Sequence, residues 1–210
     1  MLRGIPSLIL AIILALLVPA ARSANNQVRL PLAAGFDFPV GPPDGKGYYM
    51  SRGFWPHGHL GDDWNGVGGG NTDLGDPVYS MAPGIVTLAG NMRKGWGNTV
   101  IIRHAYRDRA SGRIVFIDSF NTHLNAIETK LGAVVKKGQR IGTIGSNSGM
   151  YPAHLHFEIR KNINIGMHRM KHAQDYSNYY SPVHFIKANR QLPKERGTAS
   201  VPVDNYEPYN

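Results

Sequence analysis

The chain has 210 residues, of which 23 are lysine or arginine and 14 are aspartate or glutamate, and its formal net charge is +9 at pH 7. Cysteine is absent, which excludes a disulfide framework and also excludes lipid attachment through a cysteine at a mature N-terminus. A protein this basic favours anionic polymers as partners. No nucleic-acid-binding motif is present, so nucleic acid is not expected among them.

The first residues have the pattern of a secretory signal peptide. Arg3 provides a basic start, residues 8–18 are apolar, and the small residues Ala21 and Ser23 fit the positions three and one before a cleavage site. We expect cleavage after Ser23, so that residues 1–23 are a signal peptide and the mature protein is periplasmic or secreted. The apolar run is shorter than the roughly 20 residues of a membrane-spanning helix, so we expect no membrane anchor after cleavage. An exported basic protein meets anionic envelope polymers, which are the polyanions we expect it to contact.

The remainder of the chain is predicted to be one domain followed by a tail. Residues 24–190 are enough for one domain with its own core, and no internal repeat suggests a second. Residues 24–34 are expected to be an extended lead-in. Residues 191–210 contain three prolines and few apolar residues, which predicts a mobile tail. We expect the protein to be a monomer.

Most of the predicted elements are β-strands. They are short, rich in valine, isoleucine, threonine and phenylalanine, and separated by glycine, proline, asparagine or aspartate. In chain order the predicted strands are 78–82, 85–89, 99–104, 113–122, 141–144 and 155–160. One helix is predicted after them, with Ser181 as N-cap, Pro182 at the first helical position and an apolar side up to about Ala188. The fold class is therefore mainly β: an antiparallel sheet or barrel-like sandwich with a groove and one short C-terminal helix.

Two histidines and one aspartate form the most informative pattern in the chain. His59 and Asp63 are four residues apart, and His156 lies in a predicted strand. Two imidazoles and one carboxylate suit a catalytic zinc ion, which takes three protein ligands and keeps one position for a water molecule. His154 and His156 point to the same face of a strand, so one can bind a metal while the other lies beside it.

Six blocks of the sequence, in this order, resemble the lysostaphin/LytM-type zinc endopeptidases of bacterial cell walls. The blocks are residues 59–63, 76–86, 95–104, 123–124, 138–142 and 154–158, the last of which reads His-Leu-His-Phe-Glu. The match covers about residues 36–160. The resemblance implies a LytM-type β fold with a groove, and hydrolysis of peptide bonds in peptidoglycan by a zinc-activated water.

The resemblance also selects among candidate ligands. On the residues alone, His57 is an alternative to His59, and Asp62 is an alternative to Asp63. In the family motif the glycine lies two positions after the histidine and two before the aspartate, which is the place of Gly61. The ligands of one Zn²⁺ per chain that the family pattern implies are therefore His59, Asp63 and His156.

Two further histidines occupy the family's catalytic positions. His123 and His154 are implied to flank the water and the reacting carbonyl, one as proton acceptor and the other as hydrogen-bond donor, and the sequence does not assign which does which. Glu158 lies in the same motif and is expected to be a structural partner. The other histidines are expected to have surface or packing roles: His104, His168, His172 and His184.

The chain departs from the family pattern in three places. Asn121 stands where the family commonly has tyrosine, and this puts one wall of the groove in doubt. Residues 150–153 read Met-Tyr-Pro-Ala before His154, where the family usually has Ser-Thr-Gly-Pro. Residues 161–180 extend past the usual end of the match and either line the groove or pack on the domain; packing is the favoured interpretation.

Three functions are compatible with this pattern. The leading one is a zinc endopeptidase that cuts peptidoglycan peptides, either stem-peptide cross-links or interpeptide bridges. The second is a non-catalytic activator of other wall hydrolases, a role that some relatives have after losing metal ligands. The third is a secreted bacteriolytic enzyme, or a protease of glycine-rich, elastin-like proteins. All five site positions are filled here, which favours an enzyme.

Overall fold

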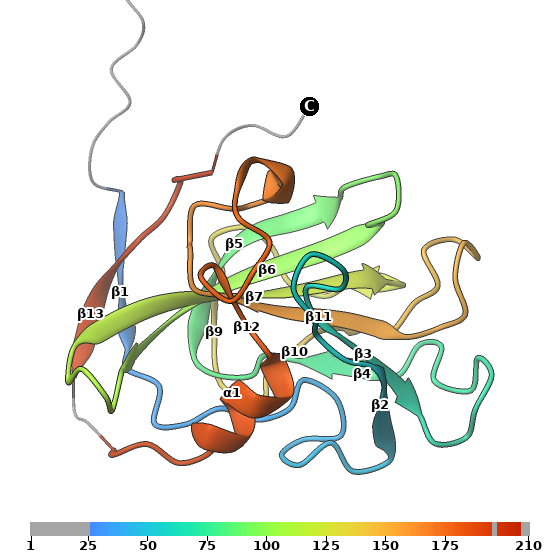
Figure 1. Cartoon of the computed structure of the whole chain (residues 1–210), viewed down its shortest axis with the longest axis horizontal. Helices are drawn as coiled ribbons and strands as arrows, with labels where there is room; N and C mark the ends of the chain where they lie inside the picture. The colour runs from blue at the N-terminus through green and yellow to red at the C-terminus, as the bar shows by residue number, and fades with distance from the viewer. Residues whose placement is uncertain (1–25, 195–196, 207–210) are drawn as a thin grey trace, which may run out of the picture.

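The computed structural model describes residues 26–194 and 197–206, and its main feature is an antiparallel sheet (Figure 1). Seven strands follow one another in the order β2-β3-β11-β7-β6-β5-β9, and β12 adds to β11. Two smaller sheets, β4-β10-β8 and β1-β13, lie outside this order. The elements are β1 (Gln27–Pro31), β2 (Tyr48–Arg52), β3 (Asp62–Gly66), β4 (Pro77–Tyr79), β5 (Gly84–Asn91), β6 (Asn98–Arg107), β7 (Ile114–Leu124), β8 (Ala126–Ile127), β9 (Val134–Val135), β10 (Arg140–Thr143), β11 (Leu155–Arg160), η1 (Arg169–Lys171), β12 (Tyr179–Tyr180), α1 (Pro182–Ala188) and β13 (Thr198–Pro202).

The mainly antiparallel β fold with one short α-helix is confirmed. Each of the six predicted strands overlaps an observed one, and β6 and β7 are longer than predicted. β2 and β3 were not predicted, because their sequences, Tyr-Tyr-Met-Ser-Arg and Asp-Asp-Trp-Asn-Gly, lack a run of β-branched residues. They form through pairing with each other and with β11. The predicted signal peptide, residues 1–23, lies outside the described residues.

The two faces of the sheet are both covered, and they carry different side chains. On β11, Leu155, Phe157 and Ile159 enter the main hydrophobic core. The residues between them, which alternate to the other face, are polar but equally buried: His156, Glu158 and Arg160. The apolar neighbours on this second face include Ile101, Phe120 and Met167. The second face of β11 therefore places a cluster of polar side chains in the protein interior, which is typical of a functional site.

Part of the C-terminal segment 191–210, for which the sequence predicts a mobile tail, forms a strand, β13 (Thr198–Pro202). β13 pairs with β1 in an antiparallel ribbon, with Val201 opposite Val28. Beyond it, Asn205 and Tyr206 accept hydrogen bonds from the Arg103 guanidinium. Arg103 is itself buried and pairs with Asp118, Nε to Oδ1 at 2.7 Å. The few apolar residues of the segment alternate along a strand, and this was the overlooked signal.

The predicted helix is present, but it is capped differently from the prediction. Ser181 occupies the N-cap position without a side-chain capping hydrogen bond, and its hydroxyl lies 2.8 Å from Nδ1 of His184. The Asp62 carboxylate, from β3, instead accepts a hydrogen bond of 2.9 Å from the backbone N–H of Val183. Since the first N–H groups of a helix need such acceptors, Asp62 joins α1 to the sheet. Within the described residues, no helix is both long and apolar enough to span a bilayer.

His104 is expected to make stability depend on pH. It is buried in β6, where Nδ1 lies 2.9 Å from the Pro83 carbonyl and Nε2 lies 2.9 Å from the Ser119 hydroxyl. Burial lowers the pKa of His104 from 6.5 to about 4. Between these two pH values the unfolded chain binds one more proton at His104 than the folded chain does. The stability that neutral His104 contributes is therefore fully present above about pH 6.5. The free energy of unfolding falls by at most about 3 kcal/mol as the pH drops toward 4.

Urea unfolding of wild type and His104→Gln between pH 7.5 and 4.5 measures this term. Wild type should lose more free energy of unfolding than the variant over that range. Equal pH slopes for the two proteins would contradict the assignment.

Candidate metal centre and cleft

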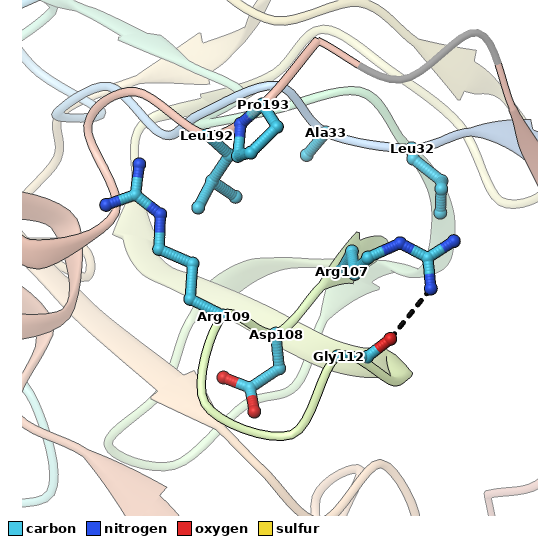
Figure 2. Close-up of a pocket in the computed structure, with 8 residues that line it drawn as sticks. All are labelled: Leu32, Ala33, Arg107, Asp108, Arg109, Gly112, Leu192 and Pro193. Atoms are coloured by element: carbon cyan, nitrogen blue, oxygen red, sulfur yellow. Dashed lines mark hydrogen bonds between the residues drawn. The ribbon is translucent and has the colours of Figure 1, made fainter.

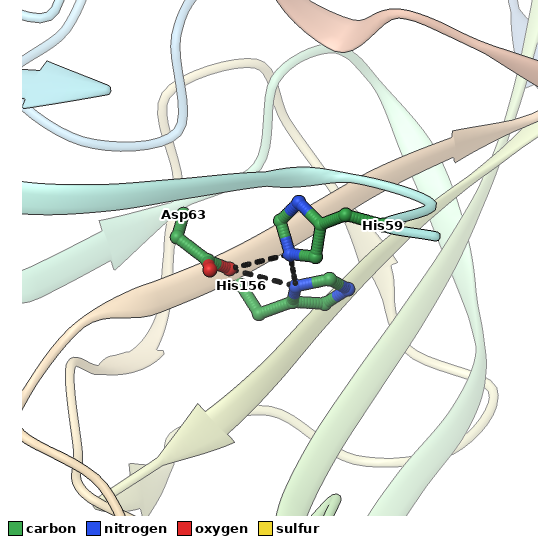
Figure 3. Close-up of side chains that lie close together, drawn as sticks. All are labelled: His59, Asp63 and His156. Carbon is green, nitrogen blue, oxygen red and sulfur yellow. Dashed lines mark hydrogen bonds and ion pairs between the residues drawn. The ribbon is translucent and has the colours of Figure 1, made fainter. Parts of the chain in front are cut away.

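The structure brings His59, Asp63 and His156 together (Figure 3). β3 and β11 are antiparallel neighbours, and Asp63 lies directly opposite His156 in their register. His59 enters from the turn that precedes β3, where its backbone pairs with that of Trp55. Nε2 of His59 lies 3.1 Å from Oδ1 of Asp63 and 3.1 Å from Nδ1 of His156. Nδ1 of His156 lies 2.8 Å from the same Asp63 oxygen. Three potential ligand atoms therefore converge on one point.

Gly61 allows this close approach. A Cβ atom at this position would lie 2.4 Å from the backbone oxygen of Phe157 and 2.9 Å from Cγ of Glu158. Any side chain would therefore push the turn that carries His59 away from β11. The glycine of the sequence motif is needed by the packing of two strands, not by the chemistry of the site.

The outward-facing nitrogens of both histidines have hydrogen-bond acceptors. Nδ1 of His59 donates to the Gly53 carbonyl at 3.0 Å, and Nε2 of His156 donates to Oε1 of Glu158 at 3.0 Å. These partners assign the proton of each ring to its outer nitrogen. In the neutral ring the inner nitrogen then carries the lone pair, which is the form in which imidazole binds a metal.

Glu158 belongs to a buried chain of charges behind His156. Its second carboxylate oxygen accepts a hydrogen bond of 2.7 Å from Nε of Arg160, and the Arg160 guanidinium lies 4.0 Å over the Phe120 ring. Burial alone raises the pKa of the Glu158 carboxyl, but Arg160 and His156 lower it to about 2. Glu158 is thus an ionised acceptor that orients His156. It does not contact the convergence point of the three ligand atoms.

The centre has an electrostatic preference for positive charge. Burial raises the pKa of the Asp63 carboxyl, yet hydrogen bonds from His156 and His59 bring it well below its usual range. Burial lowers the pKa of His156, and the neighbouring Asp63 and Glu158 carboxylates reverse this and raise it to about 9. Two carboxylates therefore stabilise a cation between them.

The donor set fits a zinc ion. Ligands at about 2.0–2.1 Å from a tetrahedral zinc are about 3.3 Å from one another, and the three atoms here are 2.8–3.1 Å apart. Two imidazoles with fixed outer protons and one ionised carboxylate are also the ligand chemistry of catalytic zinc sites.

His123 and His154 lie beside these three residues. Their rings are 4.9 Å apart, and the His123 ring is 5.8 Å from that of His156. Nε2 of His154 lies 3.8 Å from Oδ1 of Asp63. Nδ1 of His154 donates to the Pro152 carbonyl at 2.8 Å, and Nδ1 of His123 donates to the Trp96 carbonyl at 3.2 Å. Both rings therefore keep Nε2 available for a substrate.

The backbone and the pKa of His123 are both unusual. Its φ angle is 62°, in the left-handed region that few residues other than glycine adopt and that usually costs some strain. Burial, with added repulsion from His156 and His154, lowers its pKa to about 3. His123 is therefore a neutral imidazole at neutral pH.

All five residues open into one cleft of about 450 Å³. Its other lining residues are Arg52, Gly58, Gly95, Trp96, Tyr151 and Arg169. Sequence reasoning missed Arg52 and Trp96. The available signal for Trp96 was the Gly-Trp-Gly segment between two predicted strands, because such a turn lies at a sheet end. The extension 161–180 both packs on the domain and lines the cleft. Its residues Ile165, Met167 and Tyr179 are buried, whereas Arg169 lines the cleft.

The competing candidates lie elsewhere. His57 does not line the cleft; it is exposed, and its backbone N–H donates to the Gln174 carbonyl. Asp62 points to the opposite side of β3 from Asp63 and caps α1, as described above. Asn121, the departure from the family pattern, is buried beneath the surface. The wall beside His123 is formed by Tyr151 instead, with ring centroids 4.9 Å apart.

A separate cavity of about 250 Å³ shares no lining residue with this cleft (Figure 2). It lies between the β6–β7 hairpin and the segment around Leu192, and Arg107 closes one side by donating to the Gly112 carbonyl at 2.7 Å. Its lining carries no histidine and only one acid, Asp108. These side chains do not form a reactive cluster.

Comparisons with known proteins agree with this geometry. The chain is 36% identical over 88 residues to the DD-carboxypeptidase/endopeptidase Mpg of Neisseria meningitidis serogroup B, covering 42% of this chain and 18% of Mpg. It is 31% identical over 113 residues to the murein hydrolase activator NlpD of Salmonella typhimurium, covering 50% of this chain and 27% of NlpD. The chain thus spans less than a third of either curated relative.

A similar fold occurs in a solved structure of the SpoIIQ–SpoIIIAH pore-forming complex, with a TM-score of 0.51 at 18% identity over 76% of this chain and 94% of that chain. The sequence model of Peptidase family M23 matches residues 63–171, a range that contains Asp63, His123, His154 and His156. This range is more than half of the chain, and the chain belongs to peptidase family M23.

Proposed function

We propose that this protein is a zinc-dependent endopeptidase that hydrolyses peptide bonds of peptidoglycan in the cell envelope. The convergence of His59, Asp63 and His156 in a cleft that also presents two further histidines carries the proposal. The family and the name of the Mpg relative, a DD-carboxypeptidase/endopeptidase, support the reaction class, and the name of the NlpD relative, a murein hydrolase activator, supports murein as the substrate. When bound, zinc supplies Lewis-acid chemistry: it polarises a peptide carbonyl and acidifies a water molecule.

The two further histidines handle the protons and the developing charge. With Nδ1 tied to a backbone carbonyl, each ring presents Nε2 to the cleft. One Nε2 accepts a proton from the attacking water and passes it to the nitrogen of the leaving amine, and the other ring, as an imidazolium protonated from solvent, donates a hydrogen bond to the carbonyl oxygen. A positioned acid–base group of this kind typically contributes about 10²–10⁴-fold to a rate. The strained backbone of His123 is consistent with a conformation kept for this purpose.

A second candidate function is activation of other wall hydrolases, and the similarity to the murein hydrolase activator NlpD favours it. This role needs no metal ligands. The intact donor set, with its hydrogen-bonded outer nitrogens, favours the enzyme over the activator. A secreted bacteriolytic role would use the same site and differs in the wall that is attacked.

Incubation of the zinc-loaded mature protein with purified peptidoglycan, followed by mass spectrometry of the products, tests the proposal. We expect new amine and carboxyl termini at one type of peptide bond, and no product after treatment with a chelator. If the protein releases nothing alone but increases release by an added wall hydrolase, the activator is the correct function. Defined muropeptides then separate stem-peptide cross-links from glycine bridges.

A further inference from the structure

Two arginines of the cleft have no acidic partner among the described residues. Arg52, at the end of β2, and Arg169, in η1, both line the cleft. Neither guanidinium takes part in any hydrogen bond or ion pair that the structure shows within residues 26–194 and 197–206. The one acid that lines the cleft is Asp63, which is committed to His59 and His156. The rim of the cleft is therefore positively charged and uncompensated.

Each arginine is held in place by an indole ring. The Arg52 guanidinium lies 4.6 Å over the ring of Trp55, and the Arg169 guanidinium lies 5.0 Å over the ring of Trp96. A guanidinium at this distance over an indole face is attracted to the ring, and its N–H groups can still donate to another acceptor. A planar fork of donors with no partner matches a carboxylate, which it binds through two parallel hydrogen bonds.

The indoles also set the distance from the reacting bond. The Trp55 ring is 5.6 Å from the His59 ring, and the Trp96 ring is 6.2 Å from the His156 ring. In each case a single indole ring lies between the guanidinium and a histidine of the candidate metal centre. Because an extended peptide advances about 3.3–3.6 Å per residue, the two arginines face residues within about three positions of the bond at the metal centre.

We propose that Arg52 and Arg169 each bind a substrate carboxylate, and that the preferred substrate carries a free carboxylate within about three residues of the scissile bond; the residue beside that bond is the position tested. This inference rests on the proposed endopeptidase function and narrows its substrate class. It selects cross-links between stem peptides that keep a free carboxyl group beside the bond. It disfavours bridges made of glycine, and it disfavours cross-links in which that carboxyl group is amidated.

The test uses two cross-linked peptides that differ only in this group, a free carboxylate or a primary carboxamide on the residue beside the scissile bond. For the zinc-loaded wild type, kcat/KM should be on the order of 10- to 100-fold higher for the carboxylate, the range expected for hydrogen bonds to a charged group. The Arg52→Gln/Arg169→Gln double variant should lose this preference. Arg113→Gln removes an exposed arginine in the β6–β7 turn, outside the cleft, and should keep it.

Calorimetric binding of the same two peptides separates failure of this inference from failure of the proposed function. If wild type cleaves neither peptide but binds the carboxylate form more tightly, and the double variant does not, the recognition site stands and the enzymatic function fails. If wild type cleaves both peptides equally and binds them equally, the inference is overturned while the enzymatic function stands. A preference that survives in the double variant also overturns the inference.

Discussion

Replacement of His156 or His59 by alanine is expected to remove bound zinc and to reduce peptide hydrolysis by at least about 10³-fold. Each substitution deletes one of three converging ligand atoms, and loss of several kcal/mol of transition-state stabilisation by a metal corresponds to a rate effect of this size. Metal content by atomic emission and rates on a defined cross-linked peptide measure the two effects. Asp63→Asn, which keeps the side-chain shape, should give the same result.

The matched control is His57→Asn, because asparagine tolerates the left-handed backbone of this residue, whose φ angle is 60°. This variant should keep zinc and activity, since His57 lies outside the cleft. Loss of zinc from it, with zinc retained in His59→Ala, would show that the assigned ligand set is wrong. Near-UV circular dichroism distinguishes loss of metal from loss of fold, and this matters for His156, whose removal takes one hydrogen-bond partner from each of two carboxylates, Asp63 and Glu158.

His154→Ala and His123→Ala are expected to keep zinc and to lower kcat by about 10²–10⁴-fold, the usual contribution of a positioned acid–base group. Both rings are held through Nδ1 by backbone carbonyls, so their removal leaves His59, Asp63 and His156 in place. Single-turnover rates measured with metal content on the same samples separate catalysis from binding of the ion. His184→Ala, an exposed histidine outside the cleft, is the control.

A purely structural role would give a different pattern. If His123 only supports the fold, its alanine variant would lose zinc or unfold at lower urea concentration, with an unchanged rate per bound zinc. Wild-type kcat in both zinc-loaded variants would remove these histidines from the mechanism.

The reacting side chains were the part of the site that sequence could predict. The family resemblance of residues 59–63, 123–124 and 154–158 identifies five positions, and the structure brings all five into one cleft. What fixes these side chains was not visible in the sequence. The acceptors for Nδ1 of His59, His123 and His154 are backbone carbonyls, and a carbonyl has no residue type by which to recognise it.

The fold was predictable where strands have a strong apolar pattern and not where pairing alone creates them. β6 and β7 are long and rich in isoleucine, valine and phenylalanine, and both were predicted. β3 carries Asp63 and has almost no β-forming residues, so only its neighbours β2 and β11 explain it. β13 was not predicted for the same reason. Arg52 was also missed, because it reaches the cleft only through the position of β2, which ends beside the turn that carries His59.

Stepwise addition of zinc to the metal-free mature protein, with bound zinc and hydrolysis of a cross-linked peptide measured on each sample, tests the link between metal centre and function most directly. We expect hydrolysis to rise in proportion to bound zinc and to stop rising at one zinc per chain. Full hydrolysis by protein that contains no metal, or no hydrolysis by protein that holds one zinc per chain, would contradict a zinc-dependent peptidase.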